Sequence, residues 1–312
     1  RRQRQMCIRD RNNRFLDVTS NNATFTSVGT PIISHFSPFA NPDYSASTNG
    51  GSIKLNDSAI TLPASTSNSL YFNTNNFTIE GWFYFNSISV RSATLIWSLN
   101  QQGGASASIA YVYSDGSFEI SMSTNGSTPA FGVTKTAAGV IAPNTWYHIA
   151  HVRNGTATTV YINGVAKLTA TITGALASPT YNTVGGYISS GSAVWTTTGY
   201  ISDFRVVNGT AVYTSNFTPS TTPLTAITNT ALLLKGTNAG AIDVSGNNDL
   251  TSIGTAKIST SQSKFGGSSM NFSADGDRFV CYNDNLFDLR AKDFTVEFWV
   301  NITSLANLAN GI

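Results

Sequence analysis

Charged residues are scarce in this chain. Asp, Glu, Lys and Arg make up 11% of its 312 residues, compared with about 25% in an average soluble domain. Hydrophobic residues make up 41% and aromatic residues 11%. That is enough apolar surface for a folded core, and it excludes an intrinsically disordered chain. The composition favours half-buried sheets whose outer faces carry uncharged polar side chains.

The few basic residues are concentrated at the start of the chain. Five of the eighteen are Arg1, Arg2, Arg4, Arg9 and Arg11. The run Arg-Arg-Gln-Arg-Gln-Met-Cys-Ile-Arg-Asp resembles a translated transposase-type sequencing adapter, so we interpret residues 1–13 as adapter-derived or non-native. Without residues 1–11 the chain has 13 basic and 15 acidic residues, and its net charge changes from +2 to −2. The sequence therefore predicts no nucleic-acid partner.

Cysteine and long apolar runs are also lacking. If Cys7 belongs to the non-native segment, Cys281 is the one natural cysteine, and no disulfide is expected within the chain. No run of about 18 apolar residues is present, so we expect no membrane span. Neither a C-x-x-C nor an H-E-x-x-H spacing occurs, so the sequence does not predict a zinc site.

The sequence repeats itself at long range. Residues 17–22 recur at 243–248, residues 26–30 at 251–255, and residues 50–52 at 266–268. The strongest match joins Asn-Phe-Thr-Ile-Glu-Gly-Trp at 76–82 to Asp-Phe-Thr-Val-Glu-Phe-Trp at 293–299. Because these offsets fall from 226 to 217 residues, the period is a whole domain and not a short solenoid repeat.

The repeat predicts the domain organisation. We expect one domain at residues 14–226 and the N-terminal part of a second, truncated copy at 227–312. The run Ala231–Leu234 then begins the second copy. Its equivalent in the first copy falls near residues 5–8, so the first domain is expected to have lost its native first strand.

The spacing of hydrophobic residues predicts strands, with no sustained helical period. Residues 78–85 are largely apolar on both faces, which is typical of a central strand covered on both sides. Asp115-Gly116, Asn154-Gly155 and Asn163-Gly164 predict tight hairpin turns. The other expected strands cover residues 94–99, 106–113, 117–123, 147–153, 159–163, 165–173, 182–188 and 199–207. This pattern predicts an all-β fold, a two-sheet antiparallel jelly-roll sandwich.

Several motifs resemble a known family, the laminin G-like, concanavalin A-like superfamily. They are Asn-Thr-Trp-Tyr-His-Ile-Ala at 144–150, Val-Tyr-Ile-Asn-Gly-Val at 160–165, Gly-Tyr-Ile-Ser-Asp-Phe-Arg-Val at 199–206, Asp-Val-Ser-Gly-Asn-Asn at 243–248 and Phe-Thr-Val-Glu-Phe-Trp-Val at 294–300. The run at 208–219 is similar to versions found in tandem in marine phage and bacterial surface proteins. The resemblance implies a carbohydrate-binding, adhesion or structural module of a phage virion, such as a tail fibre or decoration protein, or of a bacterial surface. Its partners would be glycans, surface proteins and neighbouring repeats in the same chain.

Catalytic residues are not evident. A glycosidase needs two carboxylates about 5–9 Å apart, and laminarinase-type relatives carry them as Glu-x-Asp-x-x-Glu, a run that this chain lacks. Asp115 and Glu119 are close in sequence, but Asp115 precedes Gly116 in a predicted turn. No Gly-x-Ser-x-Gly elbow accompanies the histidines. We therefore expect a module that is not an enzyme; the alternative is a glycoside hydrolase or its carbohydrate-binding appendage.

Glu80 lies on the predicted central strand and recurs as Glu297. A buried carboxylate must be paired or hydrogen-bonded. Arg153 and His148, on a later strand, are the expected partners. A structural polar pair that fixes strand register is favoured over a ligand site.

Two kinds of ligand residue follow from the resemblance. Relatives often bind Ca²⁺ at the sandwich rim, and Asp17 and Asp203 match the positions concerned; Asp203 could equally cap a turn or pair with Arg205. For sugar binding the candidates are the rim aromatics Tyr113, Tyr187 and Trp195, which could also be ordinary loop anchors. Trp82, Trp146 and Trp299 lie within strand patterns and are expected in the core.

Overall fold

The computed structural model describes residues 19–21, 23, 25–39, 50–64, 69–88, 93–102, 105–126, 134–178, 181–236, 250–254, 256–259, 262, 264, 269–281 and 293–303. All regular structure in these segments is β-strand. They contain no helix with the length and apolar character that a membrane crossing requires. The predicted all-β fold is confirmed.

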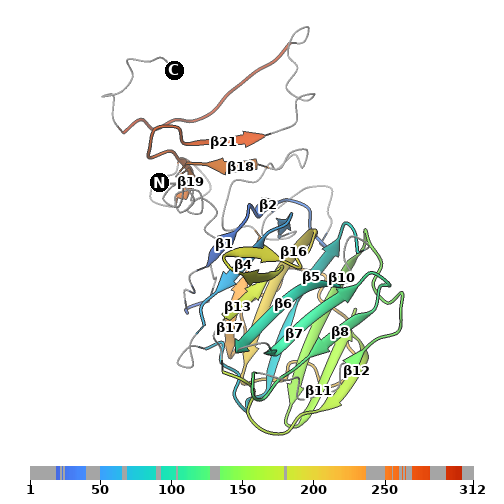
Figure 1. Ribbon diagram of the computed structural model, residues 1–312. Helices are drawn as coiled ribbons and strands as arrows, with labels where there is room; N and C mark the ends of the chain where they lie inside the picture. The colour runs from blue at the N-terminus through green and yellow to red at the C-terminus, as the bar shows by residue number, and fades with distance from the viewer. Residues whose placement is uncertain are drawn as a thin grey trace.

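Two large antiparallel sheets form the body of the molecule (Figure 1). Among the described residues, the first sheet has seven strands in the order β1 (Thr26–Val28), β4 (Ala59–Leu62), β13 (Tyr181–Val184), β6 (Ala93–Gln102), β7 (Ala105–Tyr113), β8 (Phe118–Ser121) and β9 (Thr134–Lys135). The second has eight, in the order β12 (Val165–Thr171), β11 (Ala157–Ile162), β10 (Trp146–Asn154), β5 (Phe77–Phe85), β16 (Gly199–Asn208), β3 (Ser52–Leu55) and β2 (Ile32–Ser34), with β17 (Thr230–Leu234) added to β16. A hairpin of β14 (Tyr187–Ser189) and β15 (Ser192–Val194) follows β13.

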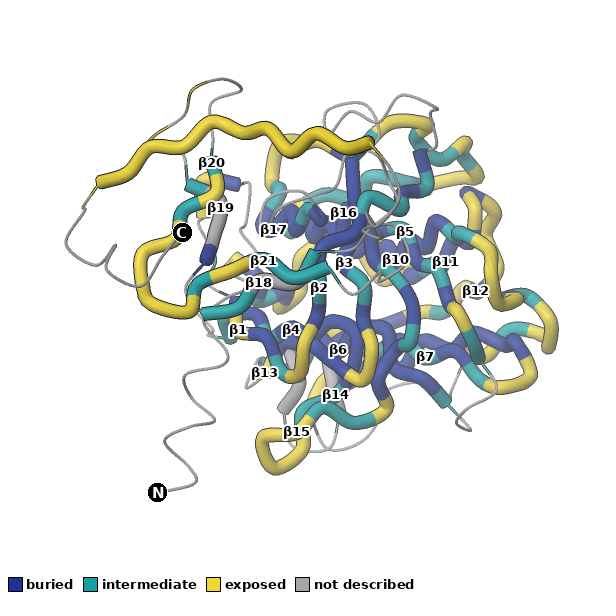
Figure 2. Tube along the Cα trace, turned by 90° about the horizontal axis from the view of Figure 1, so that it is seen from above, coloured by how far each residue is buried: buried dark blue, intermediate teal, exposed yellow. Residues whose placement is uncertain are grey.

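The core lies between the two sheets, which form two layers when seen from above (Figure 2). Its largest side chain is Trp97 of β6, which is fully buried. The Trp97 ring lies 5.7 Å from the ring of Phe83 on β5 and 6.2 Å from that of Phe204 on β16. Alternation places these rings on inner faces and polar side chains on outer ones. The structure is thus the predicted sandwich.

The predicted turns form as expected. Gly116, Gly155 and Gly164 adopt positive φ angles of 76°, 60° and 77°, at the β7–β8, β10–β11 and β11–β12 connections. Residues 182–188 differ from the prediction, because they form two strands, β13 and β14. Gly185, at φ 88°, separates them.

Strand β5 is covered on both faces, as its sequence predicted. Its inner face packs in the sandwich core. On the outer face, the Trp82 ring lies 5.6 Å from Phe39, and the Tyr84 ring lies 4.9 Å from Phe36. Because Trp82 and its cross-strand neighbour His148 both point outward with this layer, the prediction that Trp82 belongs to the inter-sheet core is wrong.

Trp146 also lies outside the inter-sheet core. It pairs with Tyr84 across β10 and β5, and its ring lies 5.3 Å from Phe36. Trp299 is 73% exposed. The core tryptophan, Trp97, is therefore one that the sequence analysis did not single out.

Strand β17 extends the sandwich past the domain boundary expected at residue 226. It pairs antiparallel with β16, and its residues Ala231, Leu232, Leu233 and Leu234 are all buried. The strand predicted to begin the second copy thus lies in the sheet of the first.

Residues 250–281 form two small hairpin-like sheets, drawn in orange in Figure 1. One pairs β18 (Leu250–Ile253) with β21 (Arg278–Cys281), and the other pairs β19 (Lys257–Ser259) with β20 (Ser269–Asn271). Residues 293–300, expected to resemble β5, are not in a strand and are exposed along their length (Figure 2). β5 is buried because β10 and β16 flank it, and the described residues contain no such pair of strands around 293–300.

Gly164 tests how the segment after β16 docks on the second sheet. A Cβ at Gly164 would lie 1.8 Å from the carbonyl oxygen of Phe217, whereas a Cβ at Gly155 meets nothing within 4 Å. Both glycines have positive φ. We expect Gly155→Ala to lower the free energy of unfolding by about 1 kcal/mol, from backbone strain alone. Gly164→Ala should lower it by about 3 kcal/mol, because overpacking adds to the strain.

Urea denaturation of the two variants and the parent chain measures this difference. Equal losses for the two alanines would show that the contact between Gly164 and Phe217 does not matter.

Candidate functional site

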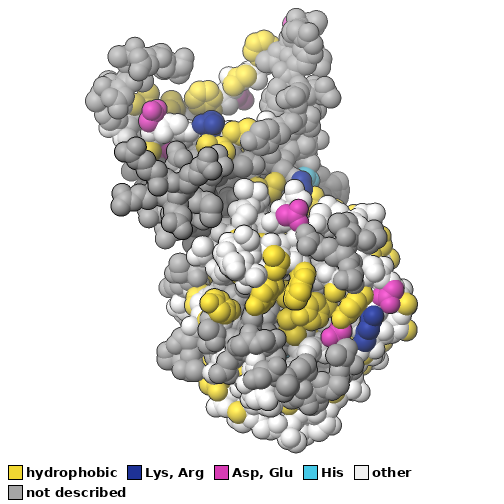
Figure 3. All heavy atoms as spheres, in the orientation of Figure 1, with side chains coloured by type: hydrophobic (Ala, Val, Ile, Leu, Met, Phe, Trp, Pro, Cys, Tyr) yellow, Lys and Arg dark blue, Asp and Glu magenta, His cyan; other side chains and the backbone are white. Residues whose placement is uncertain are grey.

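Four aromatic rings form a continuous row on the first sheet, which we call the aromatic stripe: Tyr187, Trp195, Tyr111 and Tyr113. Successive ring centroids lie 5.9, 6.5 and 6.4 Å apart. Figure 3, which views this face of the sandwich, shows hydrophobic side chains gathered across it, with basic and acidic side chains at one end. All three predicted sugar-binding residues lie in this row.

Strand alternation and cross-strand pairing create the stripe. Tyr111 and Tyr113 are two residues apart on β7, so both point away from the core, while Val112 between them is fully buried. Tyr111 lies opposite Leu95 of β6. The Leu95 amide donates to the carbonyl oxygen of Trp195 at 2.8 Å, which places the indole beside Tyr111.

Trp195 has an unusual backbone conformation. Its φ angle is 52°, and its side chain is 50% exposed. A bulky residue at positive φ costs about 1–3 kcal/mol, and such strain is concentrated at functional sites. Thr197 fixes the segment, because its amide donates to Gly185 and its hydroxyl to the carbonyl of Leu95, at 2.7 and 2.9 Å.

Polar groups surround the Tyr113 end of the stripe. The Tyr113 hydroxyl donates to Glu119 at 2.5 Å, and the Lys135 ammonium lies 3.9 Å from the Tyr113 ring centroid. Lys135 is also 3.5 Å from Asp115. Burial raises the pKa of Tyr111 to about 12, with a further contribution from the nearby Glu119 carboxylate. Tyr111 therefore keeps its proton at neutral pH.

This arrangement offers apolar ring faces beside hydroxyl, carboxylate and ammonium groups, the combination that a sugar site needs. The sequence analysis missed Tyr111, Glu119 and Lys135. Tyr111 carried a signal, its spacing of two residues from Tyr113. Glu119 lies opposite Tyr111, and Lys135 lies opposite Glu119, but these pairings required the sheet order.

A second polar cluster surrounds Glu80 on the outer face of the second sheet. Its carboxylate accepts hydrogen bonds from Arg205 at 2.6 and 2.9 Å, from Tyr213 at 2.8 Å, and lies 3.1 Å from His148 Nε2. Glu80 and His148 are fully buried. Burial acts to raise the pKa of Glu80, but the His148 hydrogen bond and the Arg205 charge outweigh it, so the pKa is lowered.

The predicted partner His148 thus contacts Glu80, but the prediction for Arg153 is wrong. Arg153 donates instead to the carbonyl oxygens of Gly155, Asn73 and Gly174, at 3.0, 3.2 and 2.9 Å. Arg153 is an odd number of residues from His148 on β10, so its side chain points to the opposite face of the sheet. Arg205 faces Glu80 because β16 pairs with β5 in that register.

Tyr213 and Phe217 close the Glu80 cluster. Their rings stack with centroids 3.6 Å apart, and both pack against Tyr161 and His148. With its carboxylate enclosed by three partners and an aromatic cover, Glu80 is shielded from any substrate. The cluster therefore serves to hold β5, β10, β16 and the segment after β16 together.

Asp203, a predicted calcium ligand, is nearly fully buried at a bulge in β16, with φ 51°. One carboxylate oxygen accepts the Leu224 amide at 2.5 Å, and the other lies 3.8 Å from the Lys235 ammonium. These contacts suit an acid that orders the chain, and they do not fit a calcium ligand, because an ammonium already occupies the cation position. Asp17 lies outside the described residues, and the described residues hold no cluster of three His, Cys, Asp or Glu side chains. Calcium binding stays a prediction.

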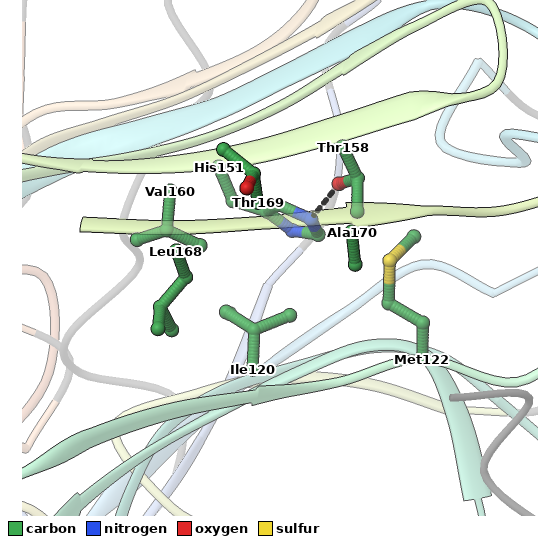
Figure 4. A pocket seen from close by; sticks show the side chains of 8 residues that line it. All are labelled: Ile120, Met122, His151, Thr158, Val160, Leu168, Thr169 and Ala170. Carbon is green, nitrogen blue, oxygen red and sulfur yellow. Dashed lines mark hydrogen bonds between the residues drawn. The ribbon is translucent and has the colours of Figure 1, made fainter. Parts of the chain in front are cut away.

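A small apolar pocket opens between β8 and the β11–β12 hairpin, with Ile120, Met122 and Leu168 around it (Figure 4). His151 lies at its wall, 2.9 Å from the Ser108 hydroxyl and 2.8 Å from that of Thr158. Burial lowers the pKa of His151 to about 3. Because Ser108 and His151 are fully buried, this pair is a core hydrogen bond and cannot act as a nucleophile with its base.

The sequence matches the family model of the concanavalin A-like lectin/glucanase superfamily over residues 54–212, just over half of the chain. The chain therefore belongs to that superfamily, which confirms the resemblance of its motifs. No curated protein sequence matches it.

Solved structures share the fold at low identity. A candidate carbohydrate binding protein from Bacteroides ovatus is 15% identical with a TM-score of 0.45, the match covering 64% of this chain and 52% of that one. The type G botulinum neurotoxin receptor binding domain is 17% identical with a TM-score of 0.45, covering 66% and 47%. Domain 4 of AbnA, an extracellular arabinanase from Geobacillus stearothermophilus solved with arabinotriose, is 16% identical with a TM-score of 0.42, covering 66% and 92%. This chain spans about half the length of the first two, and the likeness assigns neither a ligand nor an activity.

Glu80→Gln tests the buried cluster. At pH 7 the variant should lose about 3–5 kcal/mol of unfolding free energy, because Arg205 is left buried without its charge partner. The folded-state pKa of Glu80 is lower than the unfolded value. Its contribution is therefore present above about pH 4 and is lost as the pH falls through the folded pKa. We expect the parent chain to lose more stability than the variant on acidification.

Urea titrations at pH 7 and pH 3 measure both effects. The control is Glu297→Gln, which changes the exposed carboxylate at the equivalent repeat position. Unchanged stability of the Glu80 variant at pH 7 would contradict a structural role for the cluster.

Proposed function

We propose that this chain is a non-enzymatic glycan-binding module and that the aromatic stripe is its binding surface. The observation that carries the proposal is Trp195. Its indole is half-exposed and is held at a strained φ of 52° between Tyr187 and Tyr111. A residue placed only to anchor the loop would gain nothing from this combination of strain and exposure.

The stripe suits the mixed surface of a sugar. The C–H faces of a pyranose ring are apolar and pack on aromatic faces, while its hydroxyls need hydrogen-bonding partners at the edge. Trp195 and Tyr187 supply ring faces inclined by 31° to each other. Tyr113, Glu119 and Lys135 supply donors and acceptors at the other end.

A glycan-binding module of this kind would act on the surface of a phage virion or a bacterial cell, with glycans or surface proteins as partners. The motif run at 208–219 and the low charge of the chain support this placement. Neighbouring repeats in the same chain would multiply weak single-site contacts.

The alternative is a glycoside hydrolase, because Asp115 and Glu119 both lie beside the stripe. A glycosidase acid needs a raised pKa so that it holds a proton near neutral pH. The pKa of Asp115 is instead lowered by hydrogen bonds from the Ser117 hydroxyl and amide. Glu119 is bonded to Tyr113. These contacts favour binding over hydrolysis.

Trp195→Ala on a glycan array tests the binding site. We expect its affinity for the glycans that bind the parent chain to fall about tenfold or more, since a truncated aromatic anchor costs at least about 1.4 kcal/mol. Its melting temperature should not fall, because the replacement removes an exposed ring. Trp299→Ala is the matched control, since Trp299 is also exposed but lies outside the stripe.

Hydrolysis is measured on the same polysaccharides by chromatography of their products. Turnover that Glu119→Gln abolishes would establish the enzyme in place of the lectin. Equal glycan binding by the parent chain and Trp195→Ala would remove the stripe as the site.

A further inference from the structure

The edge of β16 that faces away from β5 is shared by two strands. β3 pairs with Gly199, Tyr200 and Ile201, and β17 pairs with residues 204–207. The bulge at Asp203 separates the two pairings. β17 thus completes the half of this edge that β3 leaves open.

Pairings in residues 250–281 repeat those of the sandwich. In the first copy, Ser27 of β1 lies opposite Ile60 of β4. In the second, Ser252 of β18 lies opposite Phe279 of β21, at offsets of 225 and 219 residues. These offsets fall within the range of the sequence repeat.

The next pair of strands repeats in the same way. Ile33 of β2 lies opposite Ile53 of β3, and Ile258 of β19 lies opposite Met270 of β20, at offsets of 225 and 217 residues. Two separate pairings with one register support a second module that begins with β17. By the same offset, the counterpart of β17 in the first copy falls at residues 4–8, outside the described part of the chain.

We propose that the edge of β16 at residues 204–207 is a strand-acceptor site, filled by the first strand of a following module, so that consecutive modules are joined by strand exchange. The occupant in this chain is β17. Its partner surface is backbone, so any copy of the module that carries the same strand fits the site.

Contacts at both ends of β17 define its register in the site. The Asn21 side chain donates to the carbonyl oxygen of Ala231 at 2.8 Å. Lys235, directly after the strand, lies 3.8 Å from Asp203. Gly236 follows, where a Cβ would lie 2.4 Å from the backbone of Ser52. The site therefore selects a short apolar strand followed by Lys and Gly.

The experiment uses the full chain with Leu232→Pro, which removes a backbone donor from β17 and disfavours its pairing. A synthetic peptide of residues 228–236 is then added. We expect the variant to melt at a lower temperature than the parent chain. The peptide should raise that temperature with rising concentration, because a ligand that binds the folded state alone stabilises it. The control is the same peptide carrying the Leu232→Pro change.

A second measurement does not depend on the variant. The parent chain is unfolded and refolded with excess biotin-labelled peptide, and retained peptide is quantified after gel filtration. Retention of the native peptide over the proline peptide, in the variant or the refolded parent chain, supports the acceptor site. If neither retains it, or if both peptides are retained equally, the proposal is overturned.

Discussion

A buried carboxylate constrains the second sheet. Glu80 is at the centre of β5, where both faces are covered, so its charge needs partners from other parts of the chain. Arg205 comes from β16, His148 from β10 and Tyr213 from the segment after β16. A register slip of one residue would turn Glu80 into the core and separate it from all three. The cluster therefore specifies strand order and the docking of the covering segment together.

This covering gives the two outer faces of the sandwich different roles. Phe36, Phe39, Tyr213 and Phe217 close the outer face of the second sheet over its aromatic and charged residues. The first sheet has the exposed rings of the stripe, with the β14–β15 hairpin along one side. Ligand chemistry is therefore available on the first sheet, while the second sheet supplies rigidity behind it.

The sequence predicted features that depend on neighbouring residues. The alternation of residues 78–85, the three glycine turns and the outward side chains of Tyr113 and Tyr187 all follow from local pattern and turn chemistry. Features that depend on which strands become neighbours were missed. Arg153 was chosen as the partner of Glu80 from its proximity in sequence to His148, whereas Arg205 is the partner because β16 lies against β5. Trp82 was assigned to the core because nothing local showed that Phe39 covers the outer face.

The strained backbone of Trp195 has a consequence for the history of the module. Glycine and asparagine tolerate a φ of 52° at little cost, whereas tryptophan does not. A lineage released from the need for an indole at this position would gain stability by losing it. The residue found here in diverging copies of the module thus records whether each copy still uses its stripe, independently of which sugar it binds.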